Sequence, residues 1–109
     1  MSVLVDNVTA GDSGPVWMLD HLDASGNQKD LSSGYVCQIA VEGTAISRTV
    51  TVRSADNKTF LIALTTTETA TLVVGETYTA GLQLRNDAYE PPLLMEAKRR
   101  IFILENVVP

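Results

Sequence analysis

The 109-residue sequence has one cysteine, Cys37, and one histidine, His21. An intramolecular disulfide therefore cannot form, and a zinc site built from cysteine and histidine has too few ligands. Basic residues are also few: eight Lys and Arg against thirteen Asp and Glu give a net charge of −5. Nucleic-acid binding depends on clustered Lys and Arg that neutralise phosphates, so this balance argues against a nucleic-acid partner.

Long apolar runs are absent from the sequence as well. No stretch approaches the roughly 20 apolar residues of a membrane-spanning helix, so we expect no membrane partner. The first residues lack a basic segment followed by an apolar one, so we expect no signal peptide. The lone cysteine fits a protein that is made in a reducing cytoplasm.

Short runs rich in Thr, Val and Ile recur instead, separated by Gly, Asn, Asp and Pro. This pattern is typical of β-strands joined by turns, and helical periodicity is nearly missing. Seven strands are expected, at Val3–Val8, Val16–Leu22, Gly34–Glu42, Arg48–Arg53, Thr59–Thr65, Glu76–Arg85 and Leu93–Leu104. Seven strands at this spacing in one domain, residues 1–109, predict an all-β fold: an immunoglobulin-like Greek-key β-sandwich.

Alternation of apolar and polar residues identifies the inward faces of these strands. The residues expected to face inward are Tyr35, Cys37, Ile39, Val41, Val50, Val52, Phe60, Ile62, Leu64, Tyr78, Ala80, Leu82 and Leu84. The segment Thr65–Val73 is ambiguous: Thr67 and Glu68 suit the start of a helical turn, but a Thr-rich sequence favours helix poorly. The last strand is long, so we expect it to be bent or bulged.

Few residues are candidates for chemistry. His21, between Asp20 and Asp23, could act as a base or a ligand, but a lone histidine at a strand end beside a polar turn is the favoured interpretation. Cys37 lies on the apolar face of its strand, where a free cysteine behaves as a small hydrophobic residue. We therefore predict no catalytic residues, and the protein is expected not to be an enzyme.

An oxygen-rich segment raises the possibility of a calcium loop. It contains Asp23, Ser25, Asn27 and Asp30, but the twelfth position, where an EF-hand needs a bidentate glutamate, is Gly34. A polar hairpin turn is the favoured interpretation. We accordingly predict no metal and no cofactor.

The two ends of the sequence are apolar at successive positions. A strand that is apolar on both faces is unusual in a small sandwich, in which each sheet has one wet face. Either loops cover the outer face or that face meets another subunit. We favour an assembly surface made by the terminal strands, with Val3, Val5, Ile101, Phe102, Ile103 and Leu104 as its residues.

Three segments occur in an order that resembles a known family: Thr9–Asp12, then Asp30–Tyr35 opening a strand, then Gly75–Ala80 leading into another. Over nearly the whole chain this pattern is similar to the N-terminal domain of the phage baseplate upper protein. The resemblance implies a non-enzymatic structural protein of a bacteriophage or prophage virion, assembled in the cytoplasm of the bacterial host.

In that family a linker and a receptor-binding or fibre region follow the domain, whereas this sequence ends at Pro109. We therefore expect a small tail, baseplate, head–tail or decoration component. The partners that the resemblance implies are other virion proteins and further copies of the chain, in a homo-oligomer.

The alternative function is a carbohydrate- or host-surface-binding module. Such modules use exposed aromatic side chains as anchors, and Tyr89 beside Pro91 and Pro92 is the one good candidate in the sequence.

Overall fold

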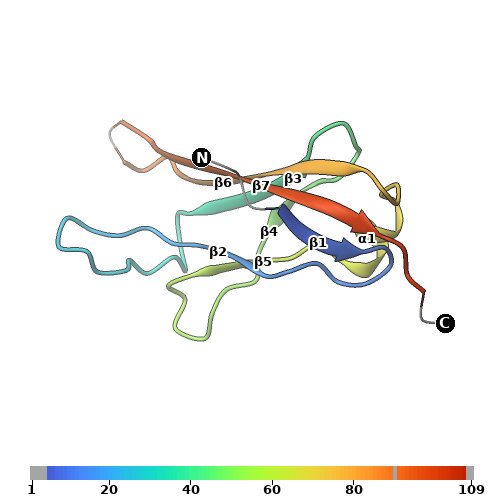
Figure 1. The fold of residues 1–109 in the computed structure, drawn as a ribbon. Helices are drawn as coiled ribbons and strands as arrows, with labels where there is room; N and C mark the ends of the chain where they lie inside the picture. The colour runs from blue at the N-terminus through green and yellow to red at the C-terminus, as the bar shows by residue number, and fades with distance from the viewer. Residues whose placement is uncertain (1–4, 90, 108–109) are drawn as a thin grey trace.

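The computed structural model describes residues 5–89 and 91–107, and these form mostly β-structure in two sheets (Figure 1). The elements of the described residues are β1 Val5–Thr9, β2 Trp17–Leu19, β3 Val36–Val41, β4 Ser47–Val50, β5 Phe60–Ile62, α1 Thr66–Ala70, β6 Thr77–Asn86 and β7 Leu93–Leu104. A five-stranded sheet has the order β1-β7-β6-β3-β4, and β2 pairs with β5 in a second sheet.

Strands β6 and β7 form the longest pairing of the five-stranded sheet. Their antiparallel register runs without interruption from Thr77 opposite Phe102 to Asn86 opposite Leu93. No bulge therefore interrupts this part of β7, so of the two predicted alternatives, a bent or a bulged strand, the bulged one is wrong here. On its other edge β7 pairs in parallel with β1, from Val5 opposite Arg100 onwards, which makes the sheet mixed.

One hydrophobic core joins the two sheets. The second sheet contributes Trp17, Phe60 and Ile62, and the five-stranded sheet contributes Cys37, Ile39, Val41, Val50, Ala80, Leu82, Leu84, Ile101 and Ile103. Trp17 lies in this core with its Nε1 donating to Asp6 Oδ2 at 3.0 Å, so the indole N–H keeps a partner. The predicted all-β, sandwich-like character is confirmed.

The predicted inward faces are confirmed at nearly every position, with Tyr35 and Tyr78 only half-buried. Val52 is the exception, because its side chain is 60% exposed. Beyond Val50, the last residue of β4, the chain no longer pairs with β3 and crosses to the second sheet. There the Val52 carbonyl accepts from the Leu61 amide at 3.0 Å. The alternation therefore stops where the ladder with β3 stops.

The second expected strand, Val16–Leu22, is observed only over Trp17–Leu19. Beyond it the chain turns back on itself, with the Lys29 amide donating to the His21 carbonyl at 2.8 Å. At the tip the Asp23 carboxylate accepts from the amides of Ser25 and Asn27. This is the polar hairpin turn that the sequence predicted.

The segment Thr65–Val73, which the sequence left ambiguous, contains a short helix, α1. Thr65 caps it: its hydroxyl accepts from the Glu68 amide, and the Glu68 carboxylate accepts from the Thr65 amide, which forms a capping box. Arg48 of β4 donates to both oxygens of the same carboxylate at 2.9 Å. These bonds attach α1 to the edge of the five-stranded sheet. In the described residues no helix has the length and apolarity to cross a membrane.

Glu68 should make stability depend on pH. The hydrogen bond from Arg48 is the main cause that lowers the pKa of Glu68 below its ordinary value of 4.5. The stability gained is therefore present above pH 4.5 and is lost as the pH falls through the lowered pKa. We expect Glu68→Gln to destabilise the fold by about 1 kcal/mol at pH 7, in line with the loss of a cap.

Thermal denaturation of wild type and Glu68→Gln between pH 7 and pH 3 measures this effect. The difference between the two should shrink as the pH drops below 4.5. The exposed carboxylate of Glu76 provides the control, and Glu76→Gln should change little at any pH. A constant gap between wild type and Glu68→Gln across the range would refute the assignment.

Candidate functional site

The outer face of the five-stranded sheet is the first candidate site. We define the outer face as the side of the sheet away from the core, where the side chains between the core residues point to solvent. Strand pairing arranges these side chains in rows: Val36–Arg85–Leu94, Thr49–Gln38–Gln83–Glu96, Ser47–Ala40–Gly81–Lys98, Val5–Arg100–Thr79 and Asn7–Phe102–Thr77. The rows cross every strand of this sheet and form one continuous surface.

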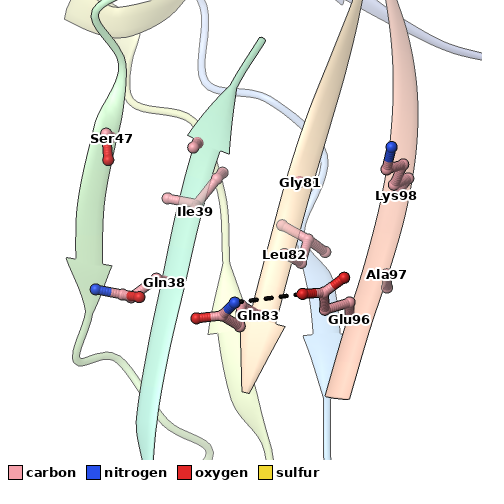
Figure 2. Close-up of a pocket in the computed structure, with 10 residues that line it drawn as sticks. Gln38, Ile39, Ser47, Gly81, Leu82, Gln83, Glu96, Ala97 and Lys98 are labelled. Carbon is pink, nitrogen blue, oxygen red and sulfur yellow. Dashed lines mark hydrogen bonds between the residues drawn. The ribbon is translucent and has the colours of Figure 1, made fainter. Parts of the chain in front are cut away.

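A shallow hollow of about 280 Å³ lies in the middle of the outer face (Figure 2). The residues that line it include Ala40, Gly81, Gln38, Gln83, Glu96, Lys98 and Ser47. The Gln83 side-chain amide donates to Glu96 at a long 3.5 Å. Lys98 and Glu42 form an ion pair at 3.6 Å, but both side chains are more than 60% exposed, so the pair contributes little to stability.

Gly81 has no side chain to fill the hollow, and its backbone conformation does not require glycine. Its φ is not positive, and a Cβ at this position would meet nothing nearer than the Ala40 carbonyl at 3.8 Å. Glycine inside a strand costs roughly 0.5–1 kcal/mol relative to alanine. A strand glycine without a conformational reason often marks a place where another backbone or ligand comes close.

The predicted assembly residues divide between the two faces of β7. Ile101 and Ile103 are fully buried in the core, so they position the strand and offer no surface to a partner. Phe102 is half-buried on the outer face, and Leu104 on the same face is 38% exposed. The apolar run of β7 thus serves two faces: one packs in the core, and the other lies on the outer face. Only the residues on the outer face remain available for the predicted interface.

The N-terminal part of that predicted interface is only partly described. Val5 of β1 is 43% exposed and lies in the row of Arg100 on the outer face. Val3 lies outside the described residues. The outer-face members of the predicted interface are therefore Val5, Phe102 and Leu104.

A cluster of aromatic side chains is the second candidate site, at the end of the molecule where the β2–β3 and β6–β7 loops project (Figure 1). His21 Nδ1 lies 2.9 Å from the hydroxyl of Tyr35, which is 3.1 Å from the hydroxyl of Tyr89. The His21 ring meets the Tyr89 ring edge-on at a centroid distance of 5.5 Å. Lys29 Nζ lies 5.5 Å from the centre of the Tyr89 ring.

The surroundings of this cluster shift the pKa values of both tyrosines. Burial, followed by the hydrogen bond with Tyr89, raises the pKa of Tyr35 to about 12. The same hydrogen bond, followed by one from Lys29, lowers the pKa of Tyr89. Tyr35 therefore stays protonated at neutral pH, and its hydroxyl can link His21 to Tyr89.

The backbone brings the residue before Tyr35, Gly34, close to the end of β6 at Asn86. Gly34 has a φ of +80°, and a Cβ there would lie 3.2 Å from the Asn86 side-chain nitrogen. Only glycine combines that backbone angle with that approach. Sequence reasoning considered His21 and Tyr89 separately and missed that Tyr35 and Lys29 join them, because no local spacing links four residues from three segments.

The remaining sequence candidates have structural roles. Asp23 and Asp30 accept backbone hydrogen bonds within turns, and the bonds from Ser32 lower the pKa of Asp30. Cys37 is fully buried, and burial raises the pKa of its thiol to about 11. Within residues 5–89 and 91–107, no three His, Cys, Asp or Glu side chains come together as a metal site.

Comparison of the sequence with protein-family models and with curated proteins finds no match.

Two neighbouring residues of β7 test the division between its faces. We expect Ile101→Asp to unfold the protein, because it places a carboxylate in a fully buried position. Phe102→Asp should leave the fold intact and remove any association that depends on the outer face. Circular dichroism melts and light scattering measure the two effects. Unfolding of Phe102→Asp would remove the main support for the predicted interface.

Proposed function

We propose that this chain is a non-enzymatic structural protein of a bacteriophage or prophage virion, and that it acts through protein–protein assembly. The observation that carries the proposal is the open outer face. It combines a central hollow with partly exposed apolar side chains at Val5, Phe102 and Leu104. A tail, baseplate, head–tail or decoration component needs such a docking surface. Its partners would be other virion proteins and further copies of the chain.

We further propose that the fold is an immunoglobulin-like Greek-key sandwich. The pairing of β3, β6 and β7 in one sheet and of β2 with β5 in the other supports this assignment. In immunoglobulin-like folds, strands that are distant in sequence are neighbours in this way, and the connections pass between the sheets. The parallel pairing of β1 with β7 places both terminal strands in the same sheet.

The state of the Cys37 thiol supports a non-enzymatic role. A reactive cysteine needs an exposed site and a lowered pKa, whereas Cys37 is buried and its pKa is raised to about 11.

The basic run 98–100 does not gather into a patch for nucleic acid. Lys98 and Arg100 lie on one face of the sheet and Arg99 on the other. Lys98 also pairs with Glu42. With a net charge of −5, this arrangement supports a protein partner over nucleic acid.

The direct test is to look for the chain in particles. Phage particles induced from the source bacterium would be purified on a density gradient and probed by mass spectrometry and immunogold labelling. We expect the protein in the particle fraction, at a regular position on the virion. Its absence from intact particles, with abundant free protein in the lysate, would overturn the proposal.

Carbohydrate or host-surface binding is a second candidate function, and the aromatic cluster favours it. The cluster presents the partly exposed ring of Tyr89 beside Lys29 and two hydrogen-bonding hydroxyls. Aromatic rings with adjacent polar groups suit the apolar faces and hydroxyls of sugars.

A pair of Tyr89 variants tests this second function. If the ring binds sugar by stacking, Tyr89→Ala should lower affinity by about tenfold or more, since a lost aromatic anchor costs above 1 kcal/mol. Tyr89→Phe keeps the ring and should retain most of the binding. A glycan array followed by calorimetry measures both. An array without hits, or a Tyr89→Ala protein that binds as wild type does, would count against it.

A further inference from the structure

We propose that the aromatic cluster of His21, Lys29, Tyr35 and Tyr89 binds a sugar that carries an acidic group, either a carboxylate or a phosphate. This inference rests on carbohydrate binding, the second candidate function, and names the class of sugar. The cluster places a cation and hydrogen-bonding groups beside an aromatic ring, and the carboxylates of the same hairpin are engaged elsewhere.

The hairpin that follows β2 places His21 and Lys29 side by side. The Lys29 amide donates to the His21 carbonyl at 2.8 Å, and the next residues inward, Leu22 and Gln28, form an antiparallel bridge. Residues that lie opposite each other in an antiparallel pair carry their side chains on the same face. The imidazole and the ammonium group therefore project from one face of this hairpin.

The ring of Tyr89 lies against both of these side chains. Its centre is 5.5 Å from the centre of the His21 ring and 5.5 Å from Lys29 Nζ. The hydroxyl of Tyr35 lies 2.9 Å from His21 Nδ1 and 3.1 Å from the Tyr89 hydroxyl, so it fixes the two rings relative to each other. An aromatic surface, an ammonium group and an imidazole are thus close enough together to contact one bound sugar.

The positive charge of Lys29 has no carboxylate partner. Among the described residues, the ion pairs join Arg48 to Glu68 and Lys98 to Glu42. Lys29 is half-buried against the cluster, so its charge is held there more closely than that of a fully exposed lysine. An acidic group on a ligand would supply the missing partner through a charge-assisted hydrogen bond.

The carboxylates of the same hairpin do not compete for this charge. Asp20 accepts from Gln28 Nε2 at 2.8 Å. Gln28 precedes Lys29 along the strand, so its side chain points to the opposite face. Asp23 accepts from the amides of Ser25 and Asn27 at the tip of the hairpin. This local separation of charge leaves a cationic face for an anion, although the whole chain has a net charge of −5.

The rest of the cluster favours a sugar over a simple anion. Tyrosine hydroxyls both donate and accept hydrogen bonds, which suits the hydroxyls of a sugar. Among the described residues only Nδ1 of His21 has a hydrogen-bond partner, so Nε2 is left for the ligand. A free phosphate ion could use Lys29 and His21 but would leave the half-buried ring of Tyr89 uncovered. A sugar covers the ring with its apolar face and places its acidic group at the ammonium.

Nuclear magnetic resonance titrations of the full chain test the proposal with glucose, glucuronic acid, a glucose phosphate and inorganic phosphate as probes. We expect the dissociation constant of at least one acidic sugar to lie about fivefold below that of glucose, the effect of one partly exposed ion pair. The acidic sugar that binds more tightly identifies the acidic group. Inorganic phosphate should bind more weakly than that sugar, because it cannot use the ring.

Substitution of Lys29 isolates the contribution of the charge. Lys29→Met keeps an apolar stem beside the Tyr89 ring, so it should bind glucose as wild type does but lose the preference for the acidic sugar. Lys29→Arg should keep the preference. Lys98→Met removes a lysine from the outer face of the five-stranded sheet and is the matched control, which should behave as wild type does. Circular dichroism melts check that every variant is folded.

The outcomes separate this inference from the function on which it rests. Equal affinity of wild type for glucose and for both acidic sugars would overturn the inference and leave carbohydrate binding in place. An unchanged preference in Lys29→Met, or inorganic phosphate that binds as tightly as the preferred sugar, would also overturn it. Failure to bind any of the sugars, together with a glycan array without hits, would refute the second candidate function itself.

Discussion

The pairing between β6 and β7 is the interaction on which the rest of the structure depends. Its ten consecutive residue pairs place β7 between β6 and β1, and β6 between β7 and β3. Without this hairpin β1 would have no partner, and the core would lose Ile101 and Ile103. The same strands carry the hollow and the charges of the outer face. One ladder of backbone hydrogen bonds therefore positions both the core and the surface proposed for assembly.

Much of this fold can be predicted from the sequence because alternation is a local signal. The inward faces of β3 and β6 follow from residues two apart. Prediction was wrong at Val52. The chain passes from one sheet to the other there, so alternation no longer indicates which side chains are buried. It also overextended β2, since a hairpin of polar residues follows Leu19 directly.

The candidate sites were less predictable because they depend on pairing between distant segments. The apolar run of β7 was visible, but the sequence does not show that Ile101 faces the core while Phe102 faces solvent until the neighbouring strands are known. The link from His21 through Tyr35 to Tyr89 depends on two loops that meet at one end of the molecule. Gly81 is recognisable as unusual only when its backbone angle and the free space beside it are known.

The parallel arrangement of β1 and β7 has a mechanical consequence. Tension between the residue that begins β1, Val5, and the residue that ends β7, Leu104, would act along the strands in opposite directions. All the hydrogen bonds between these two strands would then resist the load together, rather than one after another as when a hairpin is unzipped. A domain joined in this way is suited to transmit force along its length, a property that a protein in a contracting or flexing assembly would use.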